Sequence, residues 1–438
     1  MFRRNKAFIL VLMATIAFTG FMLTKWSNLD NVDAREDSHY TRIKTFTESL
    51  SLVKNNYVEE VDENELVYGA IKGMLTSLDP HSSFMPPETF KEMQIDTRGE
   101  FGGLGIQIGI KDRLLTIIAP IDDTPAFEAG IKAGDKIIKI EGDSTKDISL
   151  HDAVSKLRGK SGTPVTITIL RKDVEKPMDI TIIRAIIKLK SVKTRVIDET
   201  IGYVKLTQFQ EKSAEDMRKA LEKLEAKGIT ALVLDLRNNP GGLLKGAVDI
   251  TSQFLPPGKL VVYIKGRNGE QTEFNTSNGN KFYSYPMIIL VNEGSASASE
   301  IVAGAMQDWG DAVVLGNQTF GKGSVQTVIP LSDGSALRLT TARYYTPKGR
   351  SIQTTGITPD IVVKLDTEKG AATHQIIREK DLDKHLINET VSDEEVDEQE
   401  KNEGTDIIEL PSNLQDENDS QLQHAVDLLK TWRVFKKL

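Results

Sequence analysis

The sequence predicts an α/β protein built from several parts, because its pattern changes twice along the 438 residues. Apolar residues recur at helical spacing up to residue 93, and short apolar segments fill residues 101–171. From residue 201 onward, apolar strands alternate with amphipathic helices. A chain of this length holds two or three domains and buries a substantial core.

Composition excludes several classes of function. The formal net charge is −8, which disfavours nucleic-acid binding because phosphate recognition needs clustered Lys and Arg. Cysteine is absent, so disulfides, thiolate metal sites, a cysteine nucleophile and a lipid-modified N-terminal cysteine are all excluded. The sequence contains no H-E-x-x-H string, and we expect neither a metal nor a cofactor.

The N-terminus indicates the compartment. Basic residues among the first six precede an uncharged, mostly apolar run over residues 7–23, which predicts export with the positive end retained in the cytoplasm. The run is intermediate in length between a cleaved signal and a short anchor, and no A-x-A site ends it. We expect a membrane anchor over residues 1–26 and a bacterial cell-envelope protein on the extracytoplasmic face, or a secreted one if the segment is cleaved.

Residues 39–98 are expected to form a helical N-terminal region. Apolar residues recur three and four positions apart between residues 43 and 57, and a second run extends from residue 66 to residue 75. The string LDPHSSFMPPE then ends the helical pattern with its prolines. His81, within this string, is expected to be a turn residue.

Residues 99–187 predict a small barrel-like module of short strands around one helix candidate, LHDAVSKLRG. The string PAFEAGIKAGDKIIKIEG resembles that of PDZ domains, which bind extended peptide ends by adding a strand. In GGLGIQI, glycines directly precede a strand, where backbone N–H groups can converge on a peptide carboxylate. A dinucleotide loop is discarded because it would follow a strand and open a helix. The expected tail-binding residues are Gly102, Gly103, Leu104, Gly105 and Ile106.

Residues 188–366 predict the core of the protein. Buried strands such as ITALVLDLR and PMIILVN alternate with helices, which implies a mostly parallel sheet covered on both faces. Functional sites in such sheets gather at the strand ends. Residues 367–438 predict an acidic, solvated linker containing VSDEEVDEQEKNEG, followed by a last helix. That helix carries Leu422, Val426 and Leu429 on one face and should dock on the rest of the protein.

The string VNEGSASASEIVAG places three serines where a buried strand passes into a helix. A serine at that junction stands at a helix N-terminus, where free N–H groups and the dipole favour developing negative charge. An acyl-transfer nucleophile needs this geometry. The alternative is a simple connector of small residues, and spacing alone does not choose among Ser295, Ser297 and Ser299.

Lys322 is the expected base for such a serine. All six histidines lie outside residues 201–365, so a Ser-His-Asp triad would have to take its histidine from another part of the chain. An ordinary lysine has a pKa of about 10.4, whereas a working base needs one nearer 7 to 8, so the amine must be desolvated. Gly321 and Gly323 let the backbone pack close to it. An ordinary surface lysine is the alternative.

A phosphate loop is the other interpretation of this segment. Residues 316–322 spell G-x-x-x-x-G-K, but Gly323 stands where the motif requires Ser or Thr. The residues that follow are strand-like, whereas a phosphate loop opens a helix. Nucleotide binding is therefore disfavoured.

Nearly the whole ordered chain resembles the carboxyl-terminal processing peptidases, exported Ser-Lys endopeptidases with a PDZ domain ahead of a ClpP- and crotonase-like core. The motifs that carry the resemblance are LVYGAIKGMLTSLDPHSSFM, the PDZ string, LVLDLRNNPGG, GSASASEI, FGKGSVQT and TPKGRSIQTTGITPDI. It assigns the nucleophile to Ser297 and the base to Lys322. It also implies that Gln326 orients the amine, and four residues along a strand would place both side chains on one face.

The resemblance also implies how the reaction is assisted. The oxyanion donors would be the backbone N–H of Ala298 and that of a glycine in DLRNNPGG, either Gly241 or Gly242. Arg158 would link bound peptide to the active site, although a solvated cation at a helix end is an equal alternative. No cofactor or metal is implied.

Together these features predict a serine endopeptidase that cleaves extracytoplasmic proteins near their C-termini while the PDZ domain holds the free tail. The expected partners are protein substrates and, through the N-terminal segment, the membrane; a homo-oligomer is left open. The alternative is a membrane-anchored PDZ adaptor with an inactive peptidase core. A crotonase-like acyl-CoA hydrolase would need a nucleotide pocket and cytoplasmic residence, and the export segment argues against it.

Overall fold

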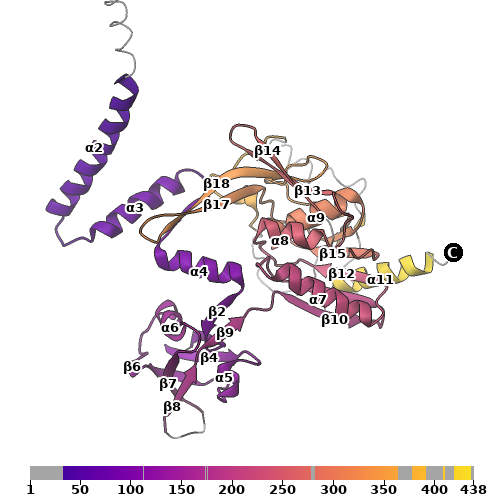
Figure 1. Ribbon diagram of the computed structural model, residues 1–438, viewed down its shortest axis with the longest axis horizontal. Helices are drawn as coiled ribbons and strands as arrows, with labels where there is room; N and C mark the ends of the chain where they lie inside the picture. Colours follow the sequence, from indigo (N-terminus) through magenta and orange to yellow (C-terminus); the bar gives the residue numbers. More distant parts are fainter. Residues whose placement is uncertain are drawn as a thin grey trace, which may run out of the picture. The chain divides into compact units, whose positions relative to one another are not determined.

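The computed structural model describes residues 33–111, 113–172, 174, 176–277, 282–363, 377–390, 408–409 and 419–435 (Figure 1). The anchor predicted over residues 1–26 lies outside these residues, as does the acidic string VSDEEVDEQEKNEG. Among the helices within the described ranges, none combines the length and the apolar character that crossing a membrane requires. The chain divides after Met74 into two units, which are described separately.

The N-terminal unit consists of helices, as the spacing of its apolar residues predicted. They are α2 (Asp33–Asn56) and α3 (Glu63–Thr76), the second of which continues two residues past the division. Several apolar side chains of α2 remain exposed, among them Ile43 and Leu52.

The second unit begins with a turn, a short strand β1 (Ser83–Met85) and the helix α4 (Pro87–Arg98). Proline is accepted at the first helical position because its missing N–H would have no helical partner there. The helix ends at Gly99, which has φ 72°, the left-handed conformation that favours glycine at this position.

The small module has the strands and the helix that the sequence predicted. An antiparallel sheet runs in the order β3-β4-β5-β7-β8, and β6 (Asp143–Ser144) pairs with β5. The sheet strands are β3 (Ile106–Lys111), β4 (Leu114–Pro120), β5 (Lys136–Ile140), β7 (Pro164–Leu170) and β8 (Met178–Ile183). The helices α5 (Pro125–Glu128) and α6 (Leu150–Leu157) complete the module. A ladder between β2 (Glu100–Gly103) and β9 (Ala185–Lys188) joins its two ends.

The core sheet runs in the order β10-β11-β12-β15-β16-β19-β20. All neighbouring strands from β11 to β20 are parallel, while β10 is antiparallel to β11. The strands are β10 (Val192–Ile197), β11 (Ile201–Leu206), β12 (Ala231–Asp235), β15 (Met287–Val291), β16 (Val313–Gly316), β19 (Ile361–Val362) and β20 (Ile408–Glu409). Both faces of the central strands are buried, and β12 and β15 are apolar apart from Asp235 at the end of β12.

Successive residues of these strands contact opposite layers. Leu232 and Leu234 of β12 belong to the core shared with α7 (Ser213–Ala226), α8 (Leu244–Thr251) and α9 (Ala298–Trp309). Val233, between them, packs on the other face with α11 (Ser420–Phe435) (Figure 1). The predicted apolar face of this last helix, Leu422, Val426 and Leu429, is buried there, so the expectation that the helix docks is confirmed.

A second, antiparallel sheet carries the segment that follows Lys322. It runs in the order β1-β18-β13-β14, and β17 pairs with β18. Its further strands are β13 (Leu260–Gly266), β14 (Gln271–Asn275), β17 (Ser324–Pro330) and β18 (Ala336–Tyr345). A strand, not a helix, therefore follows the G-x-x-x-x-G-K string, as expected when the phosphate loop was rejected.

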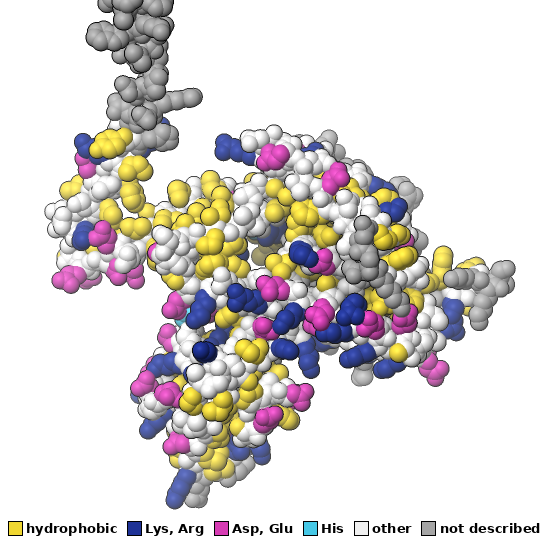
Figure 2. Space-filling view, viewed as in Figure 1, with side chains coloured by type: hydrophobic (Ala, Val, Ile, Leu, Met, Phe, Trp, Pro, Cys, Tyr) yellow, Lys and Arg dark blue, Asp and Glu magenta, His cyan; other side chains and the backbone are white. Residues whose placement is uncertain are grey.

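Charges of both signs are mixed on the surface. Figure 2 shows Lys and Arg side chains interspersed with Asp and Glu over the region of α7 and β10. On α7, Arg218 pairs with Glu222 and Lys219 pairs with Glu215. This part of the surface is not a continuous basic stripe of the kind that binds nucleic acid.

Candidate active site

Ser297 occupies a strained turn between β15 and α9. It immediately precedes the first residue of α9 and has φ 55° and ψ −112°. A positive φ is uncommon for a residue with a side chain, and strain of this kind clusters at functional sites. A sharp strand-to-helix turn also presents the serine side chain at the end of the sheet.

The three serines of the string differ in their surroundings. Ser295 is buried, and its hydroxyl donates to the carbonyl of Leu236 at 2.9 Å. Ser299 is also buried, and its hydroxyl donates to the carbonyl of Asn239 at 2.9 Å. Ser297, in contrast, is partly exposed. Two of the serines therefore attach the turn to the neighbouring DLRNNPGG loop (residues 235–242), a distinction that spacing alone could not make.

Glu300 joins the serine turn to the segment that carries Lys322. Its Oε2 accepts from the backbone N–H of Ser297 at 2.7 Å and from that of Lys322 at 3.0 Å. Its Oε1 accepts from the Thr319 hydroxyl at 2.6 Å and from the Gly321 N–H at 2.7 Å. Burial raises the pKa of Glu300 to about 7, while these hydrogen bonds favour the ionised form and lower it.

Sequence reasoning missed Glu300, although a signal was present. A Ser followed three residues later by Glu, just before an apolar helix, is the capping-box pattern. Ser297 and Glu300 stand at this spacing.

Lys322 is largely enclosed. Burial lowers the pKa of its amine, and the positive charge of Arg338 lowers it further, while Glu379, Glu300 and Asp79 act in the opposite direction. The net shift is downward, which is the direction that a general base requires.

Tyr344, on β18, is a second residue that sequence reasoning missed. It is buried, and its hydroxyl donates to the backbone carbonyl of Lys322. The same hydroxyl is within hydrogen-bonding reach of the Ser297 side chain. Burial raises its pKa well above the ordinary value, so the phenol stays protonated. Nothing in the apolar pattern of the strand distinguished it from a core residue.

Gln326 lies on β17, but the strand argument made for it does not apply. Lys322 precedes the strand, and the register of β17 against β18 shifts between Val325 and Gln326. The amide N–H groups of Gln326 donate to the hydroxyls of Ser324 at 2.9 Å and Thr340 at 3.3 Å. Its carbonyl oxygen is the end that can accept from an amine.

A series of hydrogen-bonded polar side chains contacts the Lys322 segment. Gly323 donates its N–H to the side-chain oxygen of Gln353 at 3.1 Å, and the Gln353 amide donates to Glu379 at 2.9 Å. Glu379 in turn pairs with Nε2 of His81 at 2.7 Å. His81 does lie in the predicted turn, and it also connects the LDPHSSFM string to this chain of contacts.

The DLRNNPGG loop lies against the serine turn. A Cβ placed on Gly241, which has φ 100°, would lie 2.7 Å from the carbonyl oxygen of Ala296 and 2.9 Å from the N atom of Ala298, so only glycine fits. The N–H of Gly241 donates to the side chain of Asn239 at 2.9 Å. Of the two glycines left open by the sequence, Gly242 is therefore the one whose N–H is not taken by Asn239.

The predicted tail-binding residues lie at the start of the small module. Gly102 and Gly103 pair with β9, Leu104 is buried, and Ile106 begins β3. Gly105, between the strands, has φ 79°.

A cavity of about 760 Å³ lies beside these residues. Phe101, Gly102, Val154 and Arg158 of the module line one part of it, and α4 lines another. The guanidinium of Arg158 stands 4.5 Å from the ring centroid of Phe101, a cation–π contact. Arg158 is thus partly buried against an aromatic ring rather than fully solvated.

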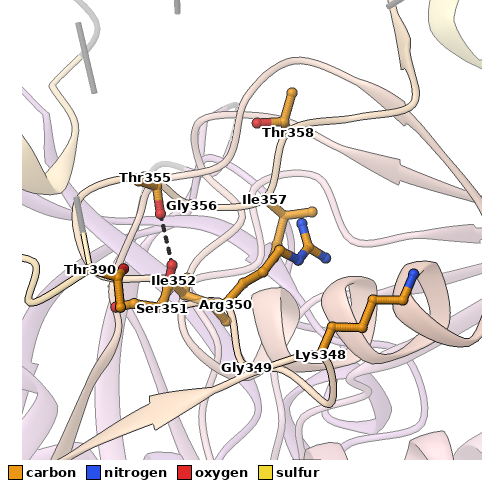
Figure 3. A pocket seen from close by; sticks show the side chains of 10 residues that line it. All are labelled: Lys348, Gly349, Arg350, Ser351, Ile352, Thr355, Gly356, Ile357, Thr358 and Thr390. Carbon is orange, nitrogen blue, oxygen red and sulfur yellow. Dashed lines mark hydrogen bonds between the residues drawn. The ribbon is translucent and has the colours of Figure 1, made fainter. Parts of the chain in front are cut away.

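A separate cavity of about 310 Å³ lies within the TPKGRSIQTTGITPDI string (Figure 3). The Thr355 hydroxyl donates to the carbonyl of Ser351 at its wall. The Arg350 side chain pairs with Asp308. None of the site residues predicted from the sequence lines this cavity.

Comparison with known proteins identifies the class. Residues 200–363 match the family model described as Peptidase family S41, and residues 102–182 match the model of the PDZ domain. Residues 10–89 match the model described as the Activating protease CtpB N-terminal domain. Fold and matches together define a serine peptidase with a PDZ domain, as the motifs predicted.

Individual relatives refine this class. The chain is 47% identical over 363 residues to the carboxy-terminal-processing protease of Bartonella bacilliformis, covering 82% of this chain and 83% of that protein. It is 38% identical over 336 residues to the carboxy-terminal processing protease CtpB of Bacillus subtilis, covering 76% and 69%. The chain belongs to the carboxy-terminal processing proteases of peptidase family S41. Among solved structures, the photosystem II D1 C-terminal processing protease aligns at 29% identity with a TM-score of 0.43, covering 73% of this chain and 92% of that one.

Proposed function

We propose that Ser297 and Lys322 are the catalytic dyad of this peptidase, with Gln326 orienting the amine. The observation that carries the proposal is the sharing of one Glu300 oxygen by the backbone N–H groups of Ser297 and Lys322. Residues that exchange a proton must be held in a fixed relation, and this carboxylate holds both chain segments. The partly exposed position of Ser297 and the lowered pKa of Lys322 support the same assignment.

The reaction follows from these roles. The neutral Lys322 amine takes the proton of the Ser297 hydroxyl as Oγ forms a bond to the scissile carbonyl carbon. The resulting ammonium gives that proton to the leaving nitrogen as the C–N bond breaks, which leaves an acyl-enzyme. Water then attacks the ester carbonyl and passes a proton to Lys322. When the ester bond breaks, Lys322 returns the proton to Ser297, and the product leaves as a carboxylic acid that gives its proton to solvent.

The negative oxygen formed during each attack needs hydrogen-bond donors. We assign these to the N–H of Ala298, the first residue of α9, and to that of Gly242 in the DLRNNPGG loop. Gly242 is favoured over Gly241 because the Gly241 N–H already donates to Asn239. The helix N-terminus at Ala298 adds its dipole to this stabilisation.

The PDZ domain is proposed to hold the free C-terminal tail of the substrate. Leu104 and Gly105 lie between β2 and β3, outside the ladder between β2 and β9, so their amides are suited to a carboxylate. Arg158 and Phe101, at the wall of the adjoining cavity, add a cation and an apolar surface. Residues 1–26 would anchor the protein so that it acts on extracytoplasmic substrates, and self-association is compatible with this arrangement.

The test uses the full chain in detergent and a folded substrate protein with an apolar C-terminal tail. The wild type should release fragments from near the tail, whereas Ser297→Ala and Lys322→Ala should lower turnover by at least about a thousandfold. Ser144→Ala and Lys348→Ala, at exposed positions, serve as controls.

Measuring both binding and cleavage of the substrate tail distinguishes a peptidase from the alternative, an inactive adaptor. Ser297→Ala should still bind the tail with wild-type affinity. Tail binding without cleavage by the wild type would support an inactive adaptor, and equal cleavage by wild type and Ser297→Ala would reject the proposed nucleophile.

A further inference from the structure

Arg237 connects the DLRNNPGG loop to the C-terminal helix. Its Nε and one terminal nitrogen donate to the two carboxylate oxygens of Asp235, at 3.0 and 2.7 Å. Its two terminal nitrogens donate to the two oxygens of Asp419, both at 2.6 Å. Arg237 is only 7% exposed, so this pairing of one guanidinium with two carboxylates is largely shielded from water.

Asp419 stands 182 positions after Arg237, at the start of α11. Its Oδ1 also accepts from the backbone N–H of Leu422 at 3.1 Å, so the same side chain caps the helix. Gln421 adds a second contact, because its side-chain oxygen accepts from Arg237 at 3.1 Å. The beginning of α11 is therefore attached to the end of β12 by one cluster of charges.

The loop beyond Arg237 reaches the serine turn through a series of hydrogen bonds. Asn238 and Asn292 exchange two of them, at 2.9 and 3.0 Å. The carbonyl of Asn239 accepts from the N–H of Ala296 at 3.1 Å and from the hydroxyl of Ser299 at 2.9 Å. The loop is thus bonded to residues on both sides of Ser297, and its Arg237 side chain is the one held by Asp419.

We propose that Asp419, acting through Arg237, is a positioning residue for the oxyanion-binding loop, so that α11 forms part of the catalytic apparatus. This inference rests on the proposed function, because it assumes that the loop supplies a donor to the oxyanion. Without the Asp419 carboxylate, the guanidinium keeps Asp235 as a charged partner and Gln421 as a neutral contact, and it loses its charged attachment to the helix. Neither residue touches the reacting atoms.

The expected effect falls on turnover rather than on substrate binding. The oxyanion exists only during attack on the carbonyl, so misplacement of its donor lowers kcat and leaves KM unchanged. Displacements of about an ångström in such groups cost up to about a hundredfold. We expect kcat to fall roughly 10- to 100-fold when the carboxylate is removed.

Two substitutions remove the carboxylate while preserving the helix start. Asp419→Asn keeps a capping oxygen, and Asp419→Gly suits the unusual φ of 117° and is accepted as a cap. The matched control is Asp198→Asn, which removes an ion pair with Lys430 near the other end of α11. All three should fold, as judged by thermal unfolding of the full chain.

Two readouts test the positioning role. One is kcat and KM for peptide cleavage. The other is the affinity of a peptide boronic acid, whose adduct with serine is a tetrahedral boronate anion with a hydroxyl oxygen at the oxyanion position. Both Asp419 variants should lose kcat and boronate affinity by similar factors at unchanged KM, while Asp198→Asn stays within twofold of wild type. Wild-type kcat in the folded Asp419 variants, or an equal loss in Asp198→Asn, would overturn the proposal.

The test also covers the case in which one variant does not fold. If Asp419→Gly is unfolded, Asp419→Asn at reduced temperature decides, because its capping oxygen remains. Failure of the proposed function itself is recognised separately, by cleavage that persists in Ser297→Ala. Wild-type activity in Asp419→Asn, with none in Ser297→Ala, rejects only the positioning role.

Discussion

The backbone N–H groups of Ser297 and Lys322 donate to a single atom, Oε2 of Glu300, at 2.7 and 3.0 Å. Ser297 lies between β15 of the core sheet and α9, whereas Lys322 lies between β16 of the core sheet and β17 of the second sheet. Because the carboxylate is fully buried and accepts four hydrogen bonds, it fixes the spacing of the two segments.

Glu300→Gln should therefore reduce activity strongly. An amide offers one accepting oxygen where the carboxylate has two, so buried N–H groups lose their partner. We expect kcat to fall at least about tenfold and the free energy of unfolding to fall by about 1–3 kcal/mol. Steady-state cleavage assays measure kcat, and denaturant unfolding measures the free energy of unfolding. Glu222→Gln, in an exposed pair on α7, is the control, and wild-type turnover in Glu300→Gln would contradict the assigned role.

The pH dependence of cleavage should follow Lys322. The proposed dyad needs the neutral amine, and the pKa of this amine is lowered from 10.5 mainly by burial. Activity should accordingly rise with pH and reach its plateau below the range of an ordinary lysine. The pH profile of kcat/KM, measured where the protein remains folded, checks this. A kcat/KM profile whose midpoint lies at the pKa of a free lysine would contradict this expectation.

Substituting Arg338 tests whether nearby charge sets the pKa of Lys322. Its positive charge lowers the pKa of Lys322, so Arg338→Gln should shift the activity profile to higher pH. Arg338 is exposed, so screening by salt should make the shift small. Arg195→Gln, at an exposed position on β10, should leave the profile in place. A shift to lower pH in Arg338→Gln would refute the electrostatic explanation.

Gly241→Ala should nearly abolish turnover. Its φ of 100° is unfavourable for alanine, and the new Cβ would press on the backbone of Ala296 and Ala298, on either side of Ser297. Gly258→Ala is the matched control, because φ is also positive there, at 79°, but the Cβ would meet open space. Both should lose about 1–2 kcal/mol of stability from backbone strain. Only Gly241→Ala should lose kcat by about a hundredfold or more.

The free C-terminal carboxylate of the substrate should lower KM. Amidating the C-terminus of a peptide substrate removes the carboxylate that the PDZ domain is proposed to bind, which should raise KM about tenfold with kcat little changed. Arg158→Ala should raise KM for the free acid, whereas Lys146→Ala, at an exposed site on the same domain, should not. Equal KM values for acid and amide would argue against tail recognition.

Much of the fold could be read from local patterns. The continuous apolar runs of β12 and β15 indicated strands buried on both faces, and the spacing of Leu422, Val426 and Leu429 indicated a docking helix. Such signals depend on periodicity within one segment, so they can be recognised without knowing which segments pack against it.

The strand argument for Gln326 rested on a premise that the structure does not meet. The argument assumed an uninterrupted strand from Lys322 onward, whereas the strand begins later and its register shifts before Gln326. The register shift leaves Thr341 of β18 without a register partner on β17, and the sequence gave no sign of it.

By itself, the sequence determined the family, the PDZ module, the serine turn and the lysine segment, because motifs and periodicity are properties of short stretches of chain. Only the tertiary structure decided which serine is left accessible, that Glu300 joins the segments of Ser297 and Lys322, that Tyr344 bonds to the second of them, and that Asp419 holds Arg237 across 182 positions. These relationships depend on burial and on contacts between distant segments. Folding alone brings such segments together.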